Sequence, residues 1–328
     1  MGRSPTLGLQ VDVIFYDYGG YKVYAKRMPR NGTIGVFCPS HIADMERYAQ
    51  IAATIERLGF TVKLGANIEK NTYGYAASAE ERADDLNALV ADDSVHMVLF
   101  GGGDSAVEIL PLIDYENIRR HPKIFSSYSD GTSILNAIHA QTGLITYYGA
   151  GPGEFFDLRY YDYQQFCSHF VEGYVAEQFV SDSKWKTLRG GNCEGVLIGG
   201  YTSLFGLMFT NEYFKYDTAN KYILFLEDHE RFSGVGEVST YLTFIGQSKF
   251  MHNVTGLIFG HYADNVPEDL LRFLERYSNI HSIPVVYTDD FGHGTRHAVL
   301  PIGEYASLDA DKQQLIFFGD AAERRRLI

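Results

Sequence analysis

The sequence is poor in cysteine and has no long apolar run. Its three cysteines, Cys38, Cys167 and Cys193, are odd in number, far apart and never in a C-x-x-C spacing. This argues against a disulfide framework and a zinc site, and it favours a reducing compartment. No stretch reaches the roughly eighteen apolar residues of a membrane span, and no signal-peptide pattern opens the chain. We therefore expect a cytoplasmic protein with no membrane segment and no bound metal.

Basic residues are also scarce. Lys and Arg total 28 against 41 Asp and Glu, a formal net charge of −13, and the longest basic run is residues 324–326. This composition argues against a nucleic-acid partner. Hydrophobic residues make up 45% and charged residues 21%, which is typical of a folded globular protein. The 328 residues suggest about two domains.

Short apolar runs alternate with helical patterns through the first half of the chain. The pattern predicts strands at 33–38, 61–64, 95–100 and 123–126, and helices at 43–58, 78–90, 105–113 and 132–140. Strands that alternate with helices indicate a parallel sheet with both faces covered. We expect a doubly wound, flavodoxin- or Rossmann-like domain over residues 1–165.

The second half has the same alternation with more irregular connections. Segment 160–186 is aromatic, with a helical pattern around 166–179, and it leads to Trp185 among polar residues and glycines. We place a linker and domain crossing at 166–190 and a β/α domain at 191–328. That domain is predicted to hold strands at 195–198, 222–226, 254–259 and 284–287 and helices at 236–245 and 267–277.

A serine follows one predicted strand directly. The strand that ends at Ser126 turns through Ser129 and Asp130 into a helix. Such a turn exposes the hydroxyl, and the next amide and the helix N-terminus favour a developing oxyanion. The alternative is that Ser129 or Asp130 is a helix N-cap, and this segment alone favours the cap.

Glycines follow a neighbouring strand. Gly101, Gly102 and Gly103 resemble a phosphate-binding loop, but the lysine and the full spacing of the known motifs are missing. Their free amides suit an oxyanion equally well, and a plain tight turn is as good an interpretation.

An acid and a base follow two later strands. Glu227 ends one apolar run, and His293 lies between Gly292 and Gly294. Together with a serine they are the parts of a Ser-His-acid triad, and the glycines let the imidazole approach closely. Taken singly, each residue more often has a structural role. A metal site at His293 and His297 is disfavoured because the segment is broken by glycines.

These motifs together closely resemble the LD-carboxypeptidase family of serine peptidases. The resemblance covers residues 33 to the end in family order, and it is carried by Gly101-Gly102-Gly103-Asp104-Ser105, Leu110–Tyr115, Pro122–Ile124, Tyr128–Thr132, Leu226-Glu227-Asp228, Gly292-His293-Gly294 and Leu300–Gly303. It implies an N-terminal doubly wound domain, a C-terminal β/α domain, a homodimer, and no metal or organic cofactor.

The resemblance also implies site residues. Ser129 would be the nucleophile, His293 its base and Glu227 the acid that orients the histidine, with the amides of Gly102 and Asp130 as the oxyanion hole. Substrate contacts are expected from Gly101, Gly103, Trp185 and Ser203. Trp185 could stack on a nucleobase, although a partly buried packing tryptophan is more common.

Two substrates and one other class of function remain open. The first substrate is a cell-wall muramoyl-tetrapeptide that loses D-alanine in peptidoglycan recycling; the second is a peptidyl-nucleotide of the microcin C immunity type. The family usually has glycine where this chain has Ser127, and its Gly-Gly-Asn-Leu segment is Gly199–Leu204 here. Tyr147–Ala150 looks more like the immunity branch. The departures at Ser127 and at Gly199–Leu204 leave a non-catalytic binding protein as a third alternative.

Overall fold

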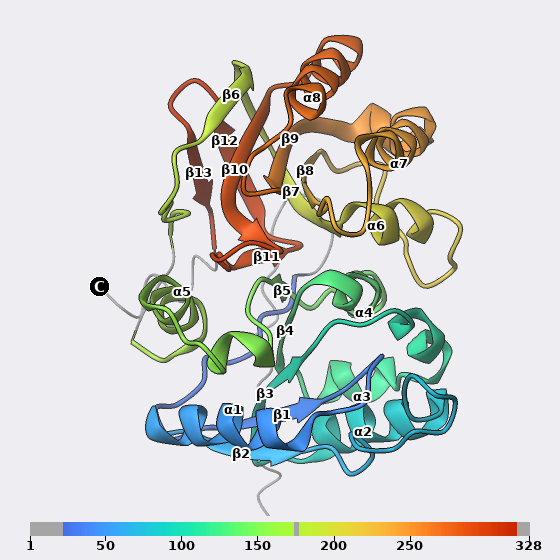
Figure 1. Ribbon diagram of the computed structural model, residues 1–328, viewed down its shortest axis with the longest axis vertical. Coiled ribbons are helices and arrows are strands. Elements are labelled where there is room, and N and C mark those ends of the chain that lie inside the picture. The colour runs from blue at the N-terminus through green and yellow to red at the C-terminus, as the bar shows by residue number, and fades with distance from the viewer. Residues whose placement is uncertain (1–21, 174–176, 320–328) are drawn as a thin grey trace, which may run out of the picture.

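Two β-sheets, one above the other in Figure 1, form the two halves of the molecule. The computed structural model describes residues 22–173 and 177–319. Within these ranges, every helix is too short or too polar to cross a membrane. The α/β architecture predicted from the alternating pattern is confirmed in both halves.

The lower sheet has six strands in the order β11-β5-β4-β3-β1-β2. Strands β1 to β5 are parallel, and their order 2-1-3-4-5 is that of a doubly wound, flavodoxin-like sheet. The last strand in the order, β11, runs antiparallel to β5. The bounds are β1 (Thr33–Phe37), β2 (Thr61–Leu64), β3 (Val95–Phe100), β4 (Ile124–Ser127), β5 (Thr146–Tyr148) and β11 (Leu300–Ile302).

Local capping determines where several helices of this half begin and end. Asp44 caps α1, and Ser78 caps α2 in a capping box with Glu81, as the spacing predicted. Gly143, at φ +74°, ends α4. The expected helix at 105–113 is a 3₁₀ helix that contains Pro111. The helices are α1 (Met45–Arg57), α2 (Ala79–Ala91), η1 (Ala106–Leu112), α3 (Tyr115–Arg120), η2 (Ser129–Gly131), α4 (Thr132–Thr142), η3 (Pro152–Phe155) and α5 (Tyr160–Phe170).

The upper sheet has seven strands in the order β13-β12-β7-β8-β9-β10-β6. Its centre, β7 to β10, is parallel, and the edge strands are antiparallel. The strands are β6 (Lys186–Arg189), β7 (Asn192–Tyr201), β8 (Tyr222–Glu227), β9 (Val254–His261), β10 (Val285–Gly292), β12 (Tyr305–Asp309) and β13 (Gln314–Phe317). The helices are α6 (Thr202–Met208), α7 (Val235–Gln247), η4 (Lys249–Asn253) and α8 (Glu268–His281).

The prediction of a helix around residues 166–179 is wrong in its placement. Helix α5 begins earlier and ends at Phe170. Beyond it, Gly173 has φ +87°, and Gln178 forms an antiparallel bridge to Ile316 near the end of the chain. Phe179, at the end of the predicted helix, instead packs on Trp185, and its amide donates to Leu315 O at 2.9 Å.

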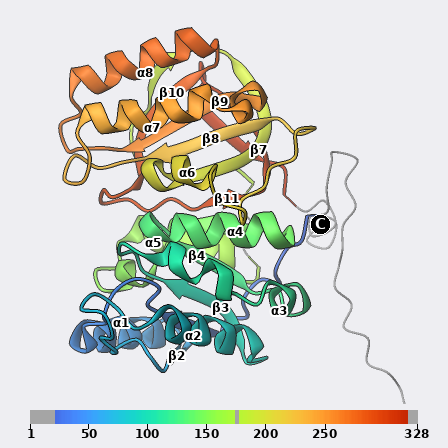
Figure 2. The ribbon, with the colours of Figure 1, turned by 90° about the vertical axis from the view of Figure 1, so that its right-hand side faces the viewer.

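Helix α4 lies between the two sheets in both ribbon views (Figures 1 and 2). Thr132, its first residue, donates from Oγ1 to Ser129 O at 2.6 Å and accepts from Tyr201 N at 2.9 Å. Asn136 Nδ2 donates to Gly199 O at 2.9 Å. These bonds bring the carboxyl ends of β4 and β7 together, so residues that follow strands of both sheets can share one site.

Gly200 permits this close approach, and its replacement should destabilise the fold. Its φ is +137°, and a Cβ there would lie 2.5 Å from Thr132 Oγ1. We expect Gly200→Ala to lower the free energy of unfolding by about 1–3 kcal/mol, measured by urea denaturation. Gly236→Ala on α7 is the control, because a Cβ there meets nothing within 4 Å. A Gly200→Ala protein as stable as that control would contradict the packing argument.

Candidate active site

Ser129 lies on a strained turn between β4 and α4. Its φ is +56°, an unfavourable region for a residue other than glycine. Its side chain forms no capping bond at either η2 or α4, and neither does that of Asp130. Ser127, where the family usually has glycine, is buried and donates to Phe100 O at 2.7 Å. Serine at position 127, in place of the glycine that is usual in the family, is therefore compatible with the strained turn that carries Ser129.

The structure brings Ser129, His293 and Glu227 together from both sheets. His293 Nε2 lies 3.0 Å from Ser129 Oγ, and His293 Nδ1 lies 2.9 Å from Glu227 Oε2. Glu227 ends β8 and is fully buried. Gly292 has φ +101°, and a Cβ there would lie 2.9 Å from Glu227 Oε2. Glycine is thus required at position 292 for two reasons. Its φ is positive, and the Glu227 carboxylate lies too close to leave room for a side chain.

The surroundings of His293 favour its charged form. Burial lowers the pKa of this imidazole, but the Glu227 carboxylate beside it more than offsets that effect, so the pKa is raised. Tyr128, Tyr201 and Phe232 pack their rings against it with centroids 5.4, 5.2 and 5.3 Å away. The aromatic rings hold the imidazole plane between the serine and the acid.

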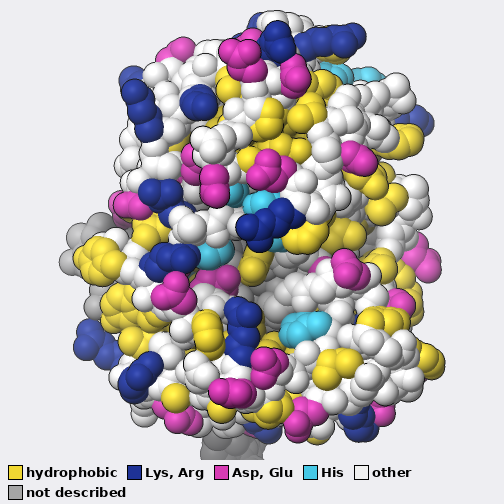
Figure 3. Space-filling model, viewed as in Figure 1, with side chains coloured by type: hydrophobic (Ala, Val, Ile, Leu, Met, Phe, Trp, Pro, Cys, Tyr) yellow, Lys and Arg dark blue, Asp and Glu magenta, His cyan; other side chains and the backbone are white. Residues whose placement is uncertain are grey.

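A pocket of about 610 Å³ opens in front of Ser129. The molecular surface is hollowed between the two halves, with histidine side chains at the edge (Figure 3). Several of the predicted site residues line the pocket: Gly101, Gly102, Gly103, Ser129, Asp130 and Ser203. The pocket lies where parallel strands of a doubly wound sheet end, the usual place for a ligand.

The glycine loop approaches the serine closely. A Cβ on Gly102 would lie 3.3 Å from Ser129 Oγ and 3.8 Å from Asp130 N. A Cβ on Gly103 would lie 2.3 Å from Ser40 O. The backbone segments of Gly102 and Asp130 therefore both lie beside Ser129.

The sequence did not reveal the side-chain role of Asp130. This carboxylate is 2% exposed, and its Oδ2 accepts from the backbone amides of Ser105 and Ala106 at 2.9 and 2.8 Å. Burial raises its pKa. Asp130 thus holds the end of the glycine loop against the turn that carries Ser129. The adjacent motifs in the sequence gave no signal of this contact, because it depends on the neighbouring strands β3 and β4.

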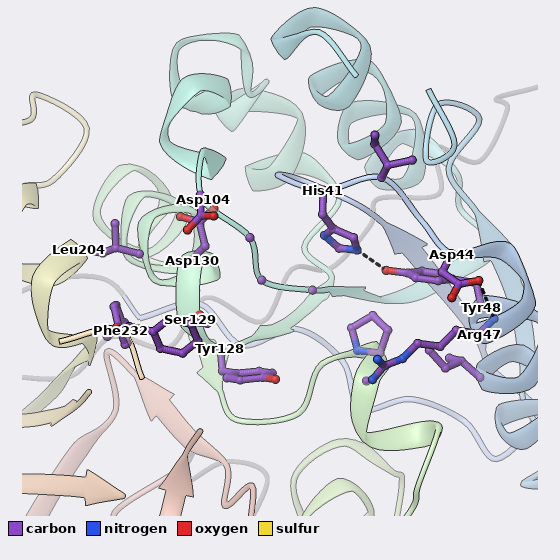
Figure 4. Close-up of a pocket in the computed structure, with 18 of the residues that line it drawn as sticks. His41, Asp44, Arg47, Tyr48, Asp104, Tyr128, Ser129, Asp130, Leu204 and Phe232 are labelled. Carbon is purple, nitrogen blue, oxygen red and sulfur yellow. Dashed lines mark hydrogen bonds between the residues drawn. The ribbon is translucent and has the colours of Figure 1, made fainter. Parts of the chain in front are cut away.

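His41 and Arg47 also line the pocket and were not predicted. Figure 4 shows both on the side of the pocket away from Leu204 and Phe232. His41 Nε2 lies 2.8 Å from the Tyr48 hydroxyl, and burial lowers the pKa of His41. They follow β1, so the pocket reaches the point between β1 and β3 where the strand order reverses.

Trp185 is not in the pocket, contrary to the expectation of a substrate contact. It is 4% exposed, its Nε1 donates to Asp290 Oδ2 at 2.9 Å, and its ring packs on Phe179. Asp290 is fully buried and also accepts from the amides of Asp182 and Ser183. The polar residues around Trp185 in the sequence thus satisfy a buried carboxylate and do not expose the indole.

His297 faces two carboxylates, those of Asp162 at 3.3 Å and Glu154 at 3.6 Å. No group of three or more His, Cys, Asp or Glu within residues 22–173 and 177–319 is arranged to hold a metal ion. The contacts of His297 tie the segment after His293 to α5 and η3.

Comparison with known families covers both halves of the chain. Residues 34–149 match the LD-carboxypeptidase N-terminal domain, and residues 194–308 match the LD-carboxypeptidase C-terminal domain. The chain belongs to the LD-carboxypeptidase family. The resemblance inferred from the ordered motifs is confirmed, and membership supports a peptidase.

Two relatives and one solved structure illustrate the range of the LD-carboxypeptidase family. A probable murein peptide carboxypeptidase of Bacillus subtilis is 30% identical over 309 residues, 90% of this chain and 94% of the relative. The microcin C7 self-immunity protein MccF of Escherichia coli is 26% identical over 319 residues, 86% and 92% of the two chains. MccF in complex with aspartyl sulfamoyl adenosine has a similar fold, with a TM-score of 0.78 and 22% identity over 90% of this chain and 98% of that one.

Replacing Trp185 should affect stability and not substrate choice. Trp185→Phe removes the Nε1 donor to Asp290, so we expect a loss of about 1–3 kcal/mol in the free energy of unfolding. Its kcat/KM values for a muramoyl-tetrapeptide and for a peptidyl-adenylate analogue should change by the same factor. A selective loss on the nucleotide substrate, at unchanged stability, would contradict the buried placement.

Proposed function

We propose that the protein is a serine carboxypeptidase that uses Ser129, His293 and Glu227. The observation that supports this most directly is the continuous path of hydrogen bonds from the buried Glu227 through His293 to Ser129 at the edge of the pocket. A serine on a strained turn, a base within hydrogen-bond reach and an acid behind the base are the requirements of nucleophilic acyl transfer.

The reaction would proceed in two stages. Ser129 Oγ attacks the scissile carbonyl carbon as His293 Nε2 takes its proton, and Glu227 stabilises the imidazolium. The amides of Gly102 and Asp130 donate to the oxyanion. His293 then protonates the leaving amine, which departs as the C–N bond breaks and leaves an acyl-serine. Water, deprotonated by His293, attacks the acyl carbon, and Ser129 recovers its proton as the acid product leaves.

The first substrate candidate is a cell-wall muramoyl-tetrapeptide that releases its terminal D-alanine. The relative described as a murein peptide carboxypeptidase, which matches nearly the full length of the chain, supports it. This substrate would place the protein in peptidoglycan recycling. A cytoplasmic location, expected from the scattered cysteines and the lack of a signal or membrane pattern, and a homodimer, implied by the resemblance, remain predictions.

The second candidate is a peptidyl-nucleotide of the microcin C type. It is supported by the relationship to MccF, whose structure contains an aminoacyl sulfamoyl nucleoside. Buried Trp185 supplies no exposed ring for a base, so the pocket residues alone would have to bind the nucleoside. Incubation with a muramoyl-tetrapeptide and with a peptidyl-adenylate analogue, followed by mass spectrometry of the products, separates the two candidates. Cleavage of neither, together with no reaction with a fluorophosphonate, would favour a non-catalytic binding protein.

Ser129→Ala should abolish hydrolysis and leave the fold intact. The hydroxyl forms the covalent bond, and kcat could fall by up to ~10⁶-fold, as in other serine hydrolases. The melting temperature should stay close to that of the wild type, because the side chain caps no helix. His293→Ala should cost about as much, and the double variant no more than either single one. Wild-type turnover by Ser129→Ala would refute the mechanism.

The pH profile of kcat/KM should report His293. The base must be neutral, so activity is lost as the pH falls through its pKa, which lies above the ordinary 6.5. Glu227→Gln removes the charge that raises this pKa, so the acidic limb should move to lower pH while the rate falls by up to about 10⁴-fold. If Asp228→Asn produced both effects and Glu227→Gln did not, the acid would be Asp228.

A further inference from the structure

Tyr148 connects the serine turn to the acid from the inside of the molecule. It is the last residue of β5 and is fully buried. Its hydroxyl accepts from the backbone N–H of Ser129 at 3.0 Å and donates to Glu227 Oε1 at 2.6 Å. With His293 on Oε2 of the same carboxylate, the contacts form a closed ring that starts and ends on Ser129.

One fixed donor sets the direction of the two hydrogen bonds at Tyr148. A backbone N–H can only donate, so the Tyr148 oxygen accepts from Ser129 and its own proton goes to Glu227 Oε1. Glu227 Oε1 is therefore an acceptor, and the 2.6 Å contact is as short as a charge-assisted hydrogen bond. In the proposed mechanism Nδ1 of His293 donates to Oε2 of the same carboxylate, which leaves Nε2 to accept from Ser129 Oγ.

We propose that Tyr148 is a positioning residue for the reaction, which holds the Ser129 turn against Glu227 and sets the proton arrangement of the ring. This inference rests on the proposed function of Ser129, His293 and Glu227. Tyr148 does not line the pocket, so it acts through these residues and not on the substrate.

The environment of Tyr148 suits this role. Burial, and next the charge of Glu227, raise the pKa of its hydroxyl well above the ordinary value, so the proton stays available to the acid. The bond to Ser129 N spans the strained turn at φ +56°, where the backbone needs an external contact to hold its conformation. The Tyr148 hydroxyl thus stabilises the turn that carries Ser129. Because it also donates to Glu227, it weakens the binding of a further proton by the Glu227–His293 pair.

The test is the rate at which a fluorophosphonate labels Ser129, followed against pH in Tyr148→Phe. The substitution keeps the ring and removes the hydroxyl. We expect labelling to slow by about 10- to 100-fold, the effect of one lost hydrogen bond to a charged group. The acidic limb should move to higher pH, because Glu227 without the tyrosine donor holds the proton of the pair more tightly.

Tyr147→Phe is the matched control, because Tyr147 precedes Tyr148 on β5 and its ring packs on Phe170. Labelling in this variant should keep the wild-type rate and pH profile. 3-Fluorotyrosine at position 148 keeps both the ring and the hydroxyl and makes the hydroxyl a stronger donor, so it should move the acidic limb to lower pH. A purely structural role for Tyr148 would leave the limb unmoved in both position-148 variants.

The outcomes separate this inference from the proposed function. If the wild type is labelled at Ser129 and Tyr148→Phe is labelled at the same rate and with the same pH profile, the role of Tyr148 is overturned and the serine mechanism stands. Absence of labelling in the wild type would overturn the mechanism itself. If Tyr148→Phe failed to fold, the shift in the 3-fluorotyrosine protein would decide, and an unshifted limb there would refute the inference.

Discussion

The hydrogen bond between His293 and Ser129 crosses from one sheet to the other, and the site exists only because the carboxyl ends of strands from both sheets come together. Ser129 follows β4 of the lower sheet, whereas Glu227 ends β8 and His293 follows β10 of the upper one. A hydrogen bond weakens steeply beyond about 3.5 Å, so the sheets must be held to within a few tenths of an ångström. Strand β11 contributes to this by leaving the upper half and pairing with β5 below.

Buried carboxylates hold the loops around the site. Asp130 binds the amides after the glycine loop, Asp290 binds the segment that contains Trp185, and Glu227 binds the hydroxyl of Tyr148 and the imidazole of His293. A buried carboxyl group needs hydrogen bonds that replace its lost hydration. Each of these acids therefore constrains the backbone or side chains that supply its donors, and the loops at the strand ends acquire defined positions.

Much of the lower sheet could be predicted because its signals are local. Alternating apolar and helical patterns located β1, β3 and β4, and Ser78 with Glu81 marked the start of α2. The aromatic segment after residue 160 misled, because helix α5 ends at Phe170 and the chain beyond it pairs with β13 through Gln178 and Ile316. The same difficulty applied to Trp185, whose polar neighbours in the sequence are the donors of a buried acid.

The sequence by itself determined the class of fold and, through the order of its motifs, the family, whose resemblance pointed to the serine, histidine and glutamate that the structure brings together. The fold class, the family and these residue identities depend on residue type and on order along the chain, and neither changes with the details of packing. Only the tertiary structure decided that Asp130 holds the glycine loop, that Trp185 is buried, and that Tyr148 connects Ser129 to Glu227. These contacts join residues from different strands and loops, and their distances follow from how the two sheets pack, which no local pattern encodes.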